Sequence, residues 1–302
     1  MNFAEKVYYK FKIDAIWNRT TSMIDRLFWT PFHIMSAAET VEFVLKNKCS
    51  VARFGDGELH IAAYGCALRF QRSDPELQRR LNQVVGSQNE RLLICLPKRI
   101  NAVSRKERKK LPPFWQQALE IHLHPWLKNF SRIRCYGDTN MSRIVDCNSM
   151  QEQIEKVRLV KSLWKNRNVI MVEGEKTRFG VGNDLFDQVL SVYRILGPAE
   201  SAFDYFGQLL KACLMLSKNI EDPLFLLALG PTATVLASDL ADHGVQAIDI
   251  GHLDISYEKV LRNSNERVPG KYTNESLGGN LVEECNDPDY LSQIVFRIGI
   301  EP

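Results

Sequence analysis

No part of this 302-residue chain approaches the roughly 20 consecutive apolar residues that a membrane-spanning helix needs. The first residues also lack the continuous apolar core of a secretion signal. The seven cysteines are an odd number, and none forms a C-x-x-C pair or a cluster with histidine at zinc-binding spacing. We therefore expect a cytoplasmic protein whose thiols stay reduced, without disulfides.

Several enzyme motifs are missing as well. The chain has no Walker-type phosphate loop, and it has no G-x-S-x-G turn or Ser/His/Asp order, which argues against a serine hydrolase. Gly180 and Gly182 lack the third glycine of a dinucleotide-binding fingerprint. The net charge of +3 is small, so the total charge gives no reason to expect a nucleic-acid partner.

What the chain does contain is a regular alternation of short apolar runs with helical patterns. Such alternation is typical of a mainly parallel sheet with helices on both faces, so we predict an α/β fold. A capping box begins at Ser36, and Asp74 followed by Pro75 is a second helix start. The predicted helices cover residues 36–46, 74–85, 114–127, 151–164, 184–192, 202–216 and 232–242, and the predicted strands cover 51–54, 91–96, 133–136, 168–172, 193–196, 224–229, 245–250 and 294–298.

Asp56 and Glu58 directly follow the buried strand predicted at 51–54, and they alternate there with Gly55 and Gly57. We predict a tight turn beyond the carboxyl end of the strand, which is the edge of an open α/β sheet where ligands bind. Two carboxylates at this spacing offer hard oxygen ligands for one divalent cation, which could in turn hold a diphosphate. The alternative is a polar turn with a helix-capping aspartate.

Residues 173–184 follow the buried strand predicted at 168–172 and combine glycines with two cations, Lys176 and Arg178. The pattern predicts a helix beginning at Asp184. Backbone N–H groups at such a start bind anions, and lysine or arginine adds charge-assisted hydrogen bonds to phosphate. The alternative is a mobile polar loop.

Two further strand exits carry polar residues. Gly230 is followed by hydroxyl groups in the first turn of a predicted helix, an arrangement that suits a phosphate, a ribose or a plain helix cap. The exit after 245–250 carries carboxylates and an imidazole, which are plausible general bases, although a lone histidine is more often structural. These candidates are Thr232 and Thr234 at the first exit, and Asp254, His252 and Glu258 at the second.

Two segments stand out by charge and aromatic content. Residues 1–35 mix aromatic and basic side chains over a helical pattern, and residues 98–110 hold seven basic residues against a single glutamate. One interpretation is an N-terminal helix packed on the main domain or on a second subunit, next to a solvated basic face. The other is contact of both segments with anionic lipid headgroups.

The motifs at these four exits resemble the GT-D-type bacterial glycosyltransferases, a family first described as a domain of unknown function. The resemblance covers residues 36–272 with all motifs in order. It rests on RFGDGE at 53–58, VEGEK at 172–176 with GVGNDLF at 180–186, LGPTATVLA at 229–237 and AIDIGHLD at 247–254.

This resemblance implies a Rossmann-like domain that transfers a sugar from a UDP-sugar, with Asp56 and Glu58 similar to the metal-binding Asp-x-Glu pair of nucleotide-sugar transferases. Residues 1–35 would form a helical extension, and residues 273–302 a tail packed on the domain. Family members glucosylate serine-rich adhesins or occur near surface-polysaccharide genes. The donor-binding residues we expect are Arg53, Gly55, Lys176, Arg178, Gly182, Asn183, Asp184, Gly230, Thr232 and Thr234.

We therefore expect a glycosyltransferase that depends on a divalent metal (Mn²⁺ or Mg²⁺) and moves a hexose from a nucleotide-diphosphate sugar such as UDP-glucose. The acceptor would be a glycan, a glycoprotein or a lipid-linked saccharide, at the inner face of the membrane or in the cytoplasm. We expect no nucleic-acid partner, and the chain could form a homo-oligomer. The alternatives are a non-catalytic partner subunit that binds nucleotide sugars, and a metal-dependent phosphohydrolase.

Overall fold

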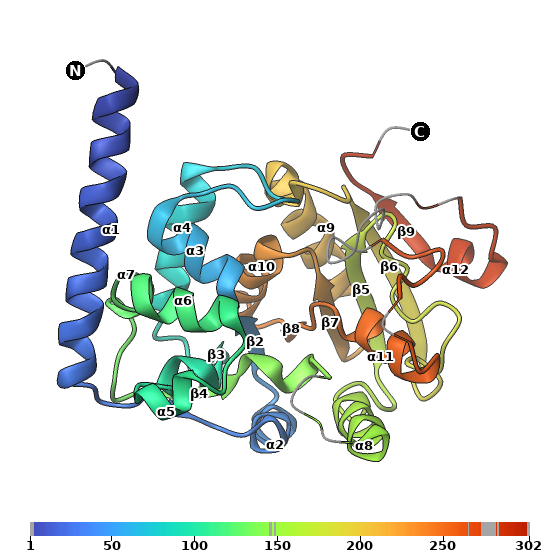
Figure 1. Ribbon diagram of the computed structural model, residues 1–302. Helices are drawn as coiled ribbons and strands as arrows, with labels where there is room; N and C mark the ends of the chain where they lie inside the picture. The colour runs from blue at the N-terminus through green and yellow to red at the C-terminus, as the bar shows by residue number, and fades with distance from the viewer. Residues whose placement is uncertain are drawn as a thin grey trace.

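The computed structural model describes residues 3–144, 147, 149–264, 266–272, 282 and 284–300, with side chains described from residue 14 onward. Figure 1 shows its helices and strands. The helices are α1 (Phe3–Leu27), α2 (Ala37–Asn47), α3 (Asp56–Tyr64), α4 (Pro75–Val85), α5 (Arg105–Arg108), α6 (Pro113–Ile121), α7 (Leu123–Leu127), α8 (Met150–Lys161), α9 (Phe206–Asn219), α10 (Pro231–Asp242), α11 (Leu253–Leu261) and α12 (Pro288–Gln293), with 3₁₀ turns η1 (Lys98–Asn101), η2 (Thr139–Ser142) and η3 (Ala202–Tyr205).

The strands form one sheet in the order β1-β4-β3-β2-β8-β7-β5-β6-β9, and each described strand pair is parallel. This confirms the predicted α/β class. The two halves of the sheet meet where Val51 of β2 lies opposite Ile248 of β8. The strands are β1 (His33–Ile34), β2 (Ser50–Arg53), β3 (Leu92–Leu96), β4 (Cys135–Asp138), β5 (Asn168–Gly174), β6 (Ser191–Gly197), β7 (Pro223–Ala228), β8 (Ala247–Asp249) and β9 (Ile294–Arg297).

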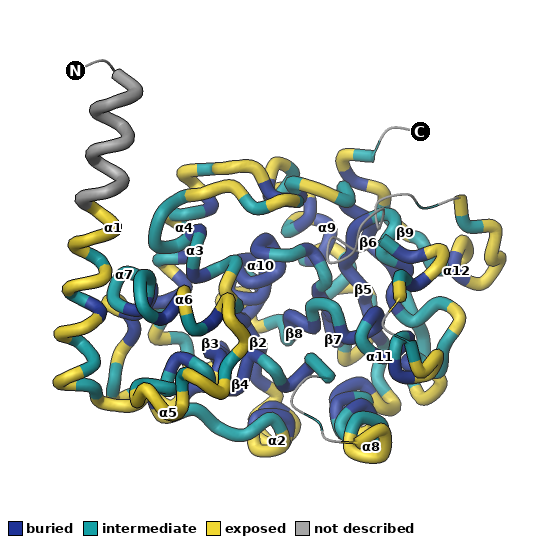
Figure 2. The backbone as a smooth tube through the Cα atoms, viewed as in Figure 1, coloured by how far each residue is buried: buried dark blue, intermediate teal, exposed yellow. Residues whose placement is uncertain are grey.

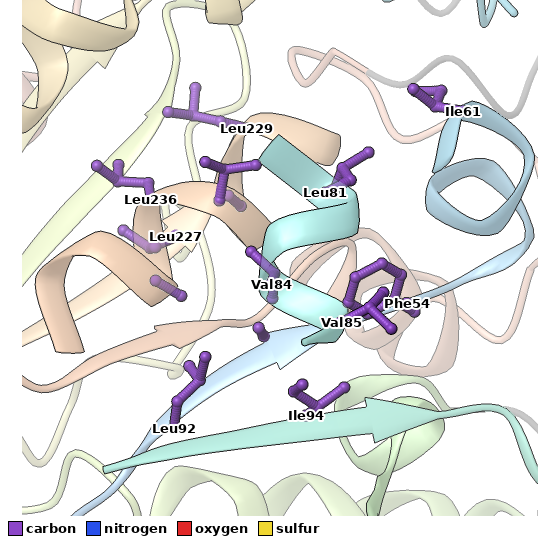
Figure 3. Close-up of a cluster of buried hydrophobic side chains, with 14 of the residues drawn as sticks. Phe54, Ile61, Leu81, Val84, Val85, Leu92, Ile94, Leu227, Leu229 and Leu236 are labelled. Carbon is purple, nitrogen blue, oxygen red and sulfur yellow. The ribbon is translucent and has the colours of Figure 1, made fainter. Parts of the chain in front are cut away.

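Helices cover both faces of the sheet. Successive strand residues point to opposite faces, so each strand contributes side chains to the core on both sides. On β3, Ile94 joins one buried cluster with side chains from α4, α6, α9 and α10, whereas Leu93 joins a second cluster with side chains from α2, α8 and α11. Figure 3 shows part of the first cluster, in which Leu81 of α4 and Leu236 of α10 pack over the sheet. In Figure 2 the central strands are buried, as β2 and β3 are along their whole length, and the outer helical surfaces are exposed.

Two predictions of local structure were wrong. The glycine-rich stretch after β2 is not a turn, because Gly55 serves as the N-cap of helix α3, which begins at Asp56. Residues 184–192 form turns and the start of β6 instead of a helix. The carboxylate of Asp184 binds Lys161 Nζ at 2.6 Å, so it does not cap a helix, and Trp164 Nε1 donates to the Leu185 carbonyl at 2.7 Å.

Helix α1 lies along one side of the molecule and packs against α6 and α7 (Figure 1). At the opposite side, β9 extends the sheet by pairing with β6, which places residues 294–297 on the main domain. Within the described residues, no helix has the length and apolar content needed to cross a bilayer. The seven cysteines are free thiols.

Candidate functional site

A cavity of about 400 Å³ opens at the carboxyl edge of the sheet. The segments that follow β2, β3, β4, β5, β6, β7 and β8 each contribute to its wall, so the edge expected to gather the strand exits does gather them. Cavities at this edge are where α/β proteins bind ligands, and the volume suits a ligand of nucleotide size. Of the expected site residues, the wall includes Arg53, Gly55, Asp56, Glu58, Gly230, His252 and Asp254.

A buried ion pair forms the floor of the cavity. Arg53 Nη2 donates to Asp249 Oδ1 at 3.0 Å, and Arg53 Nη1 donates to Ser142 Oγ at 2.8 Å and to the Thr139 carbonyl at 3.1 Å. Burial raises the pKa of Asp249, and the charge of Arg53 opposes that shift. Arg53 Nε is buried and has no hydrogen-bond acceptor in the described part of the structure.

Position 251, beside this ion pair, accepts only glycine without strain. Its φ of +54° lies in the left-handed region, and a Cβ atom there would stand 1.9 Å from Arg53 Nη2. The guanidinium cannot simply move away, because Asp249 and the η2 segment hold it. The expected donor residue Thr234 also serves this floor, since its hydroxyl donates to the Arg53 carbonyl at 2.9 Å.

Asp56 and Glu58 both line the cavity, in the first turn of α3. The Asp56 side chain is exposed, whereas Glu58 Oε2 accepts a hydrogen bond from the Gly55 backbone N–H at 2.8 Å. Burial raises the pKa of Glu58 to about 7, with further contributions from the charges of Asp249 and Asp56. Helical side chains two positions apart do not face each other, so the pair does not form a ready two-carboxylate chelate.

The described residues hold no group of three or more His, Cys, Asp or Glu side chains placed to bind a metal ion. An ion bound by Asp56 and Glu58 would therefore need further ligand atoms from elsewhere, as Mg²⁺ commonly takes them from substrate phosphates and water. Metal binding at this pair stays a prediction.

The 173–184 segment lies beside the cavity but sends different residues into it than we expected. Gly174, Thr177 and Phe179 line the wall, whereas the expected Lys176, Arg178, Gly182, Asn183 and Asp184 do not. Arg178 is buried and its Nη1 donates to the Gly270 carbonyl at 2.8 Å. At the start of the segment, the buried Glu173 carboxylate pairs with Arg194 at 2.5 Å. The two cations of this loop therefore do not line the cavity in this structure, and their binding to a ligand stays a prediction.

The expected bases Asp254 and Glu258 belong to a buried cluster around Lys271. Lys271 Nζ lies 2.8 Å from Asp254 Oδ2 and 3.3 Å from Glu258 Oε1. Asn183 Nδ2 donates to both carboxylates, at 2.7 Å to Asp254 and 2.8 Å to Glu258, and the Gly180 N–H donates to Asp254 at 3.0 Å. Burial raises the pKa of Asp254, which Lys271 counteracts.

The three expected bases therefore differ in position. His252, the N-cap residue of α11, lines the cavity and is only partly buried. Asp254 touches the cavity from within the Lys271 cluster, whereas Glu258 is not part of the wall. Thr232 is likewise outside the wall, buried in the first turn of α10.

Sequence reasoning missed several cations and aromatic rings that line the cavity, among them Arg69, Phe70, Arg99, Trp115 and Arg143. Phe70 packs so closely that a Cβ atom at Gly230 would stand 2.4 Å from its ring, and Gly230 also has a φ of +55°. The Arg99 guanidinium lies 5.9 Å from the Trp115 ring centre. Arg99 belongs to the basic 98–110 segment, whose high charge was the available signal. Arg143 lies shortly after β4, and no feature of the sequence around it marked it as a site residue.

Comparison with known proteins gives consistent results. The family model of the glycosyltransferase GT-D fold matches residues 51–276. The chain is 34% identical over 272 residues to a probable glycosyl transferase Gly of Streptococcus gordonii, and 34% identical over 264 residues to the glycosyltransferase GlyD of Streptococcus pneumoniae. These alignments cover 89% and 86% of this chain, but the chain spans only 39% and 32% of the two relatives.

Solved structures agree over the whole of their length. A structure described as domain of unknown function 1792 with a distinct glycosyltransferase fold matches with a TM-score of 0.81 and 31% identity, covering 93% of this chain and 100% of that one. A structure described as a new glycosyltransferase from Streptococcus sanguinis matches with a TM-score of 0.76 and 31% identity, covering 89% of this chain and 100% of that one.

Proposed function

This chain belongs to the glycosyltransferase family of the GT-D fold, and we propose that it transfers a hexose from a nucleotide-diphosphate sugar, UDP-glucose or a similar donor, in the cavity at the carboxyl edge of its sheet. The observation that carries the proposal is that one cavity combines arginines with a carboxylate pair. Arginines suit a diphosphate, and carboxylates suit the metal that commonly accompanies it. The acceptor would be a glycan, a glycoprotein or a lipid-linked saccharide, as in surface-polysaccharide synthesis or adhesin glycosylation.

The donor diphosphate would lie among Arg69, Arg99 and Arg143, which reach the cavity from three different segments. Arg53 supports an anionic ligand in a second way. Its buried Nε–H lacks an acceptor within the described residues, and leaving such a donor unsatisfied costs about 1–3 kcal/mol. A ligand oxygen or an ordered water in the cavity would supply that acceptor. The Phe70 and Trp115 rings offer flat surfaces for a base or a sugar.

Asp56 and Glu58 would hold the divalent metal, Mn²⁺ or Mg²⁺. The negative charge around this pair is what fits a divalent cation. Desolvation, together with the nearby negative charges of Asp249 and Asp56, raises the pKa of Glu58, and an added cation would offset that repulsion. Bound there, a metal would offset the negative charge that develops on the leaving diphosphate.

Within the transfer step, the acceptor hydroxyl attacks the anomeric carbon, the bond from that carbon to the diphosphate oxygen breaks, and the hydroxyl proton passes to a base. The sequence placed Asp254 first among the candidate bases. We favour His252, because Asp254 is buried in an ion pair with Lys271, whereas His252 lines the cavity and is only partly buried.

The test is to incubate the purified protein with UDP-glucose and other UDP-, GDP- and dTDP-sugars, with and without manganese, and to measure nucleotide release and labelled sugar transfer. A matched pair of variants is Asp56→Asn, in the cavity, and Asp187→Asn, exposed and outside its wall. Loss of turnover in the first variant alone supports the proposal.

Two other outcomes would replace the proposal. Thermal stabilisation by a nucleotide sugar without any turnover would identify a non-catalytic binding subunit. Release of phosphate from substrates that lack a sugar would identify a phosphohydrolase. The carboxylate pair favours an enzyme over a binding subunit, since binding alone does not need a metal-type pair.

A further inference from the structure

Helix α1 packs on the domain through a polar side, and its large apolar side chains lie on the side that is left uncovered. The covered side faces α6 and α7. There Ser22 Oγ accepts a hydrogen bond from the His124 backbone N–H at 3.2 Å, and the Asp25 carboxylate lies 2.5 Å from His124 Nδ1. The other side, which we call the α1 apolar face, consists of the exposed residues Ile16, Trp17, Met23, Ile24, Leu27 and Phe28.

These six residues form one continuous stripe. They recur at intervals of seven and eleven positions, which brings helical residues back to the same side. Trp17 is 67% exposed, Leu27 is 72% exposed and Phe28, just past the helix, is 82% exposed. Figure 2 shows the exposed surface along the described part of α1. A contiguous exposed stripe of large apolar side chains marks an interaction site, so we expect this side of α1 to have a partner.

Next to the end of α1 lies the basic segment 98–110. Asn101 of that segment and Phe32, shortly after α1, exchange two hydrogen bonds, at 2.9 and 3.0 Å. Arg108 is close enough to Arg26 of α1 for its charge to add to the lowering of the Arg26 pKa that burial causes. The exposed cations of the segment are Lys98, Arg105, Lys106, Lys109 and Lys110.

We propose that the α1 apolar face and the basic segment 98–110 together dock this protein on an anionic lipid surface. Tryptophan and other large apolar side chains enter the boundary between headgroups and acyl chains, and neighbouring lysines and arginines are attracted to anionic headgroups. Charge disfavours a second copy of the chain as the missing partner, because a copy that contacted this corner through the same patch would meet the positive charge with its own.

Docking would also place the cavity near the lipid, and this step rests on the proposed function. Arg99 belongs to the basic segment and lines the cavity, and the neighbouring Trp115 lies on α6, which packs against α1. The docked surface and the cavity are therefore joined by one short stretch of chain. An acceptor saccharide carried on a lipid would reach the cavity without leaving the membrane.

The experiment is co-sedimentation of the full-length protein with phosphatidylcholine vesicles, with and without phosphatidylglycerol, at low and high salt. We expect binding to the anionic vesicles, weakened by salt. One variant removes apolar side chains from the α1 apolar face, and a second reverses charges in the basic segment. We expect each variant to lower the partition coefficient onto anionic vesicles by about tenfold or more. The first is Trp17→Ser, Ile24→Ser and Leu27→Ser, and the second is Lys106→Glu, Lys109→Glu and Lys110→Glu.

Matched control variants change exposed residues of the same kind elsewhere on the surface, and they should bind vesicles as the original protein does. The apolar control is Leu190→Ser, Met215→Ser and Leu291→Ser, and the charge control is Lys165→Glu, Lys211→Glu and Lys218→Glu. No binding to anionic vesicles at low salt would overturn the proposal. So would binding that the Trp17, Ile24 and Leu27 variant leaves unchanged, or a lipid-free dimer that this variant dissociates in analytical ultracentrifugation.

Nucleotide release from the donor in the absence of vesicles separates this inference from the proposed function. Both docking variants should keep that activity, since none of the substituted residues lines the cavity. Loss of vesicle binding with normal release supports docking. Normal vesicle binding by a protein that turns over no nucleotide sugar would leave docking standing and remove the transferase proposal.

Discussion

Arg53 and Asp249 join the two halves of the sheet, because their side chains meet at 3.0 Å from the ends of β2 and β8. Both are buried, and the same arginine also binds Ser142 Oγ beyond β4. One guanidinium therefore fixes three strand ends relative to one another. Since the cavity wall consists of these strand ends, its shape depends on an ion pair that sits beneath the proposed ligand.

Gly251→Ala should destabilise the protein by about 3 kcal/mol, since the new methyl group meets the Arg53 guanidinium and the φ of +54° strains any residue with a Cβ atom. Gly182→Ala is the matched control. Its φ of +79° is equally left-handed, but no atom lies within 4 Å of the added Cβ, so we expect only about 1 kcal/mol of backbone strain. Urea unfolding of both variants measures the difference, and equal losses would show that Arg53 can move aside.

Asp56→Asn and Glu58→Gln should each lower transfer by about a hundredfold or more if a metal at this pair stabilises the leaving group, with little change in the melting temperature. Chelator treatment of the original protein should have the same effect, reversed by manganese. The measurement is nucleotide release, with Asp187→Asn as the control. A Glu58→Gln enzyme that keeps full activity in chelator would contradict the metal assignment.

Arg143→Gln and Arg99→Gln should weaken donor binding or turnover by about tenfold or more, as expected for the loss of a charge-assisted hydrogen bond to phosphate. Lys176→Gln removes the same charge nearby, but Lys176 is not part of the cavity wall, so its kinetics should stay close to those of the original protein. Steady-state kinetics with the donor varied provides the comparison. If Lys176→Gln were as damaging as Arg143→Gln, the 173–184 loop would have to close over the ligand.

Lys271→Met should destabilise the fold by about 3–5 kcal/mol near neutral pH, because it leaves Asp254 buried without its cation. The pH dependence follows from the raised pKa of Asp254. Burial disfavours the charged form of Asp254, and protonation removes that charge. The loss of folding stability in Lys271→Met should therefore shrink as the pH falls toward the raised pKa of Asp254 and grow as the pH rises above it.

Thermal unfolding across pH measures this effect, and Lys271→Arg is the control that keeps the charge. A deficit that does not change with pH would mean that lost packing, rather than the unpaired carboxylate, is the cause.

The sequence was sufficient wherever one local signal decided the structure. The capping box of Ser36 and Glu39 and the Asp74-Pro75 pair each begin a helix in the expected place, and the short apolar runs became buried parallel strands. The turn predicted at Asp56 was wrong. Gly55 and Gly57 suggested a turn, but glycine also serves as an N-cap, and the Glu58 side chain closes the first turn of helix α3. The helix predicted to begin at Asp184 was also wrong, because the Asp184 carboxylate binds Lys161, which is distant in the sequence.

The candidate site was less accessible to sequence reasoning. Strand exits could be found one by one, and they do meet at one edge. Which side chains turn inward at that edge depends on contacts between distant segments, such as Lys271 with Asp254 or Phe70 with Gly230. Lys271 lies in a polar, turn-rich stretch without any motif, so nothing in its neighbourhood marked it as the partner of a predicted base.

The strand order also governs how the molecule can fold during synthesis. β2 and β8 are central neighbours in the sheet, yet nearly two hundred residues separate Val51 from its partner Ile248. β2 thus leaves the ribosome long before its partner strand exists, with one edge paired to β3 and the other open. Closing so long a loop is slow, and an open strand edge invites pairing with other chains. The seam beneath the cavity can therefore form only after β8 has been synthesised, and until then β2 keeps an edge that can pair with another chain.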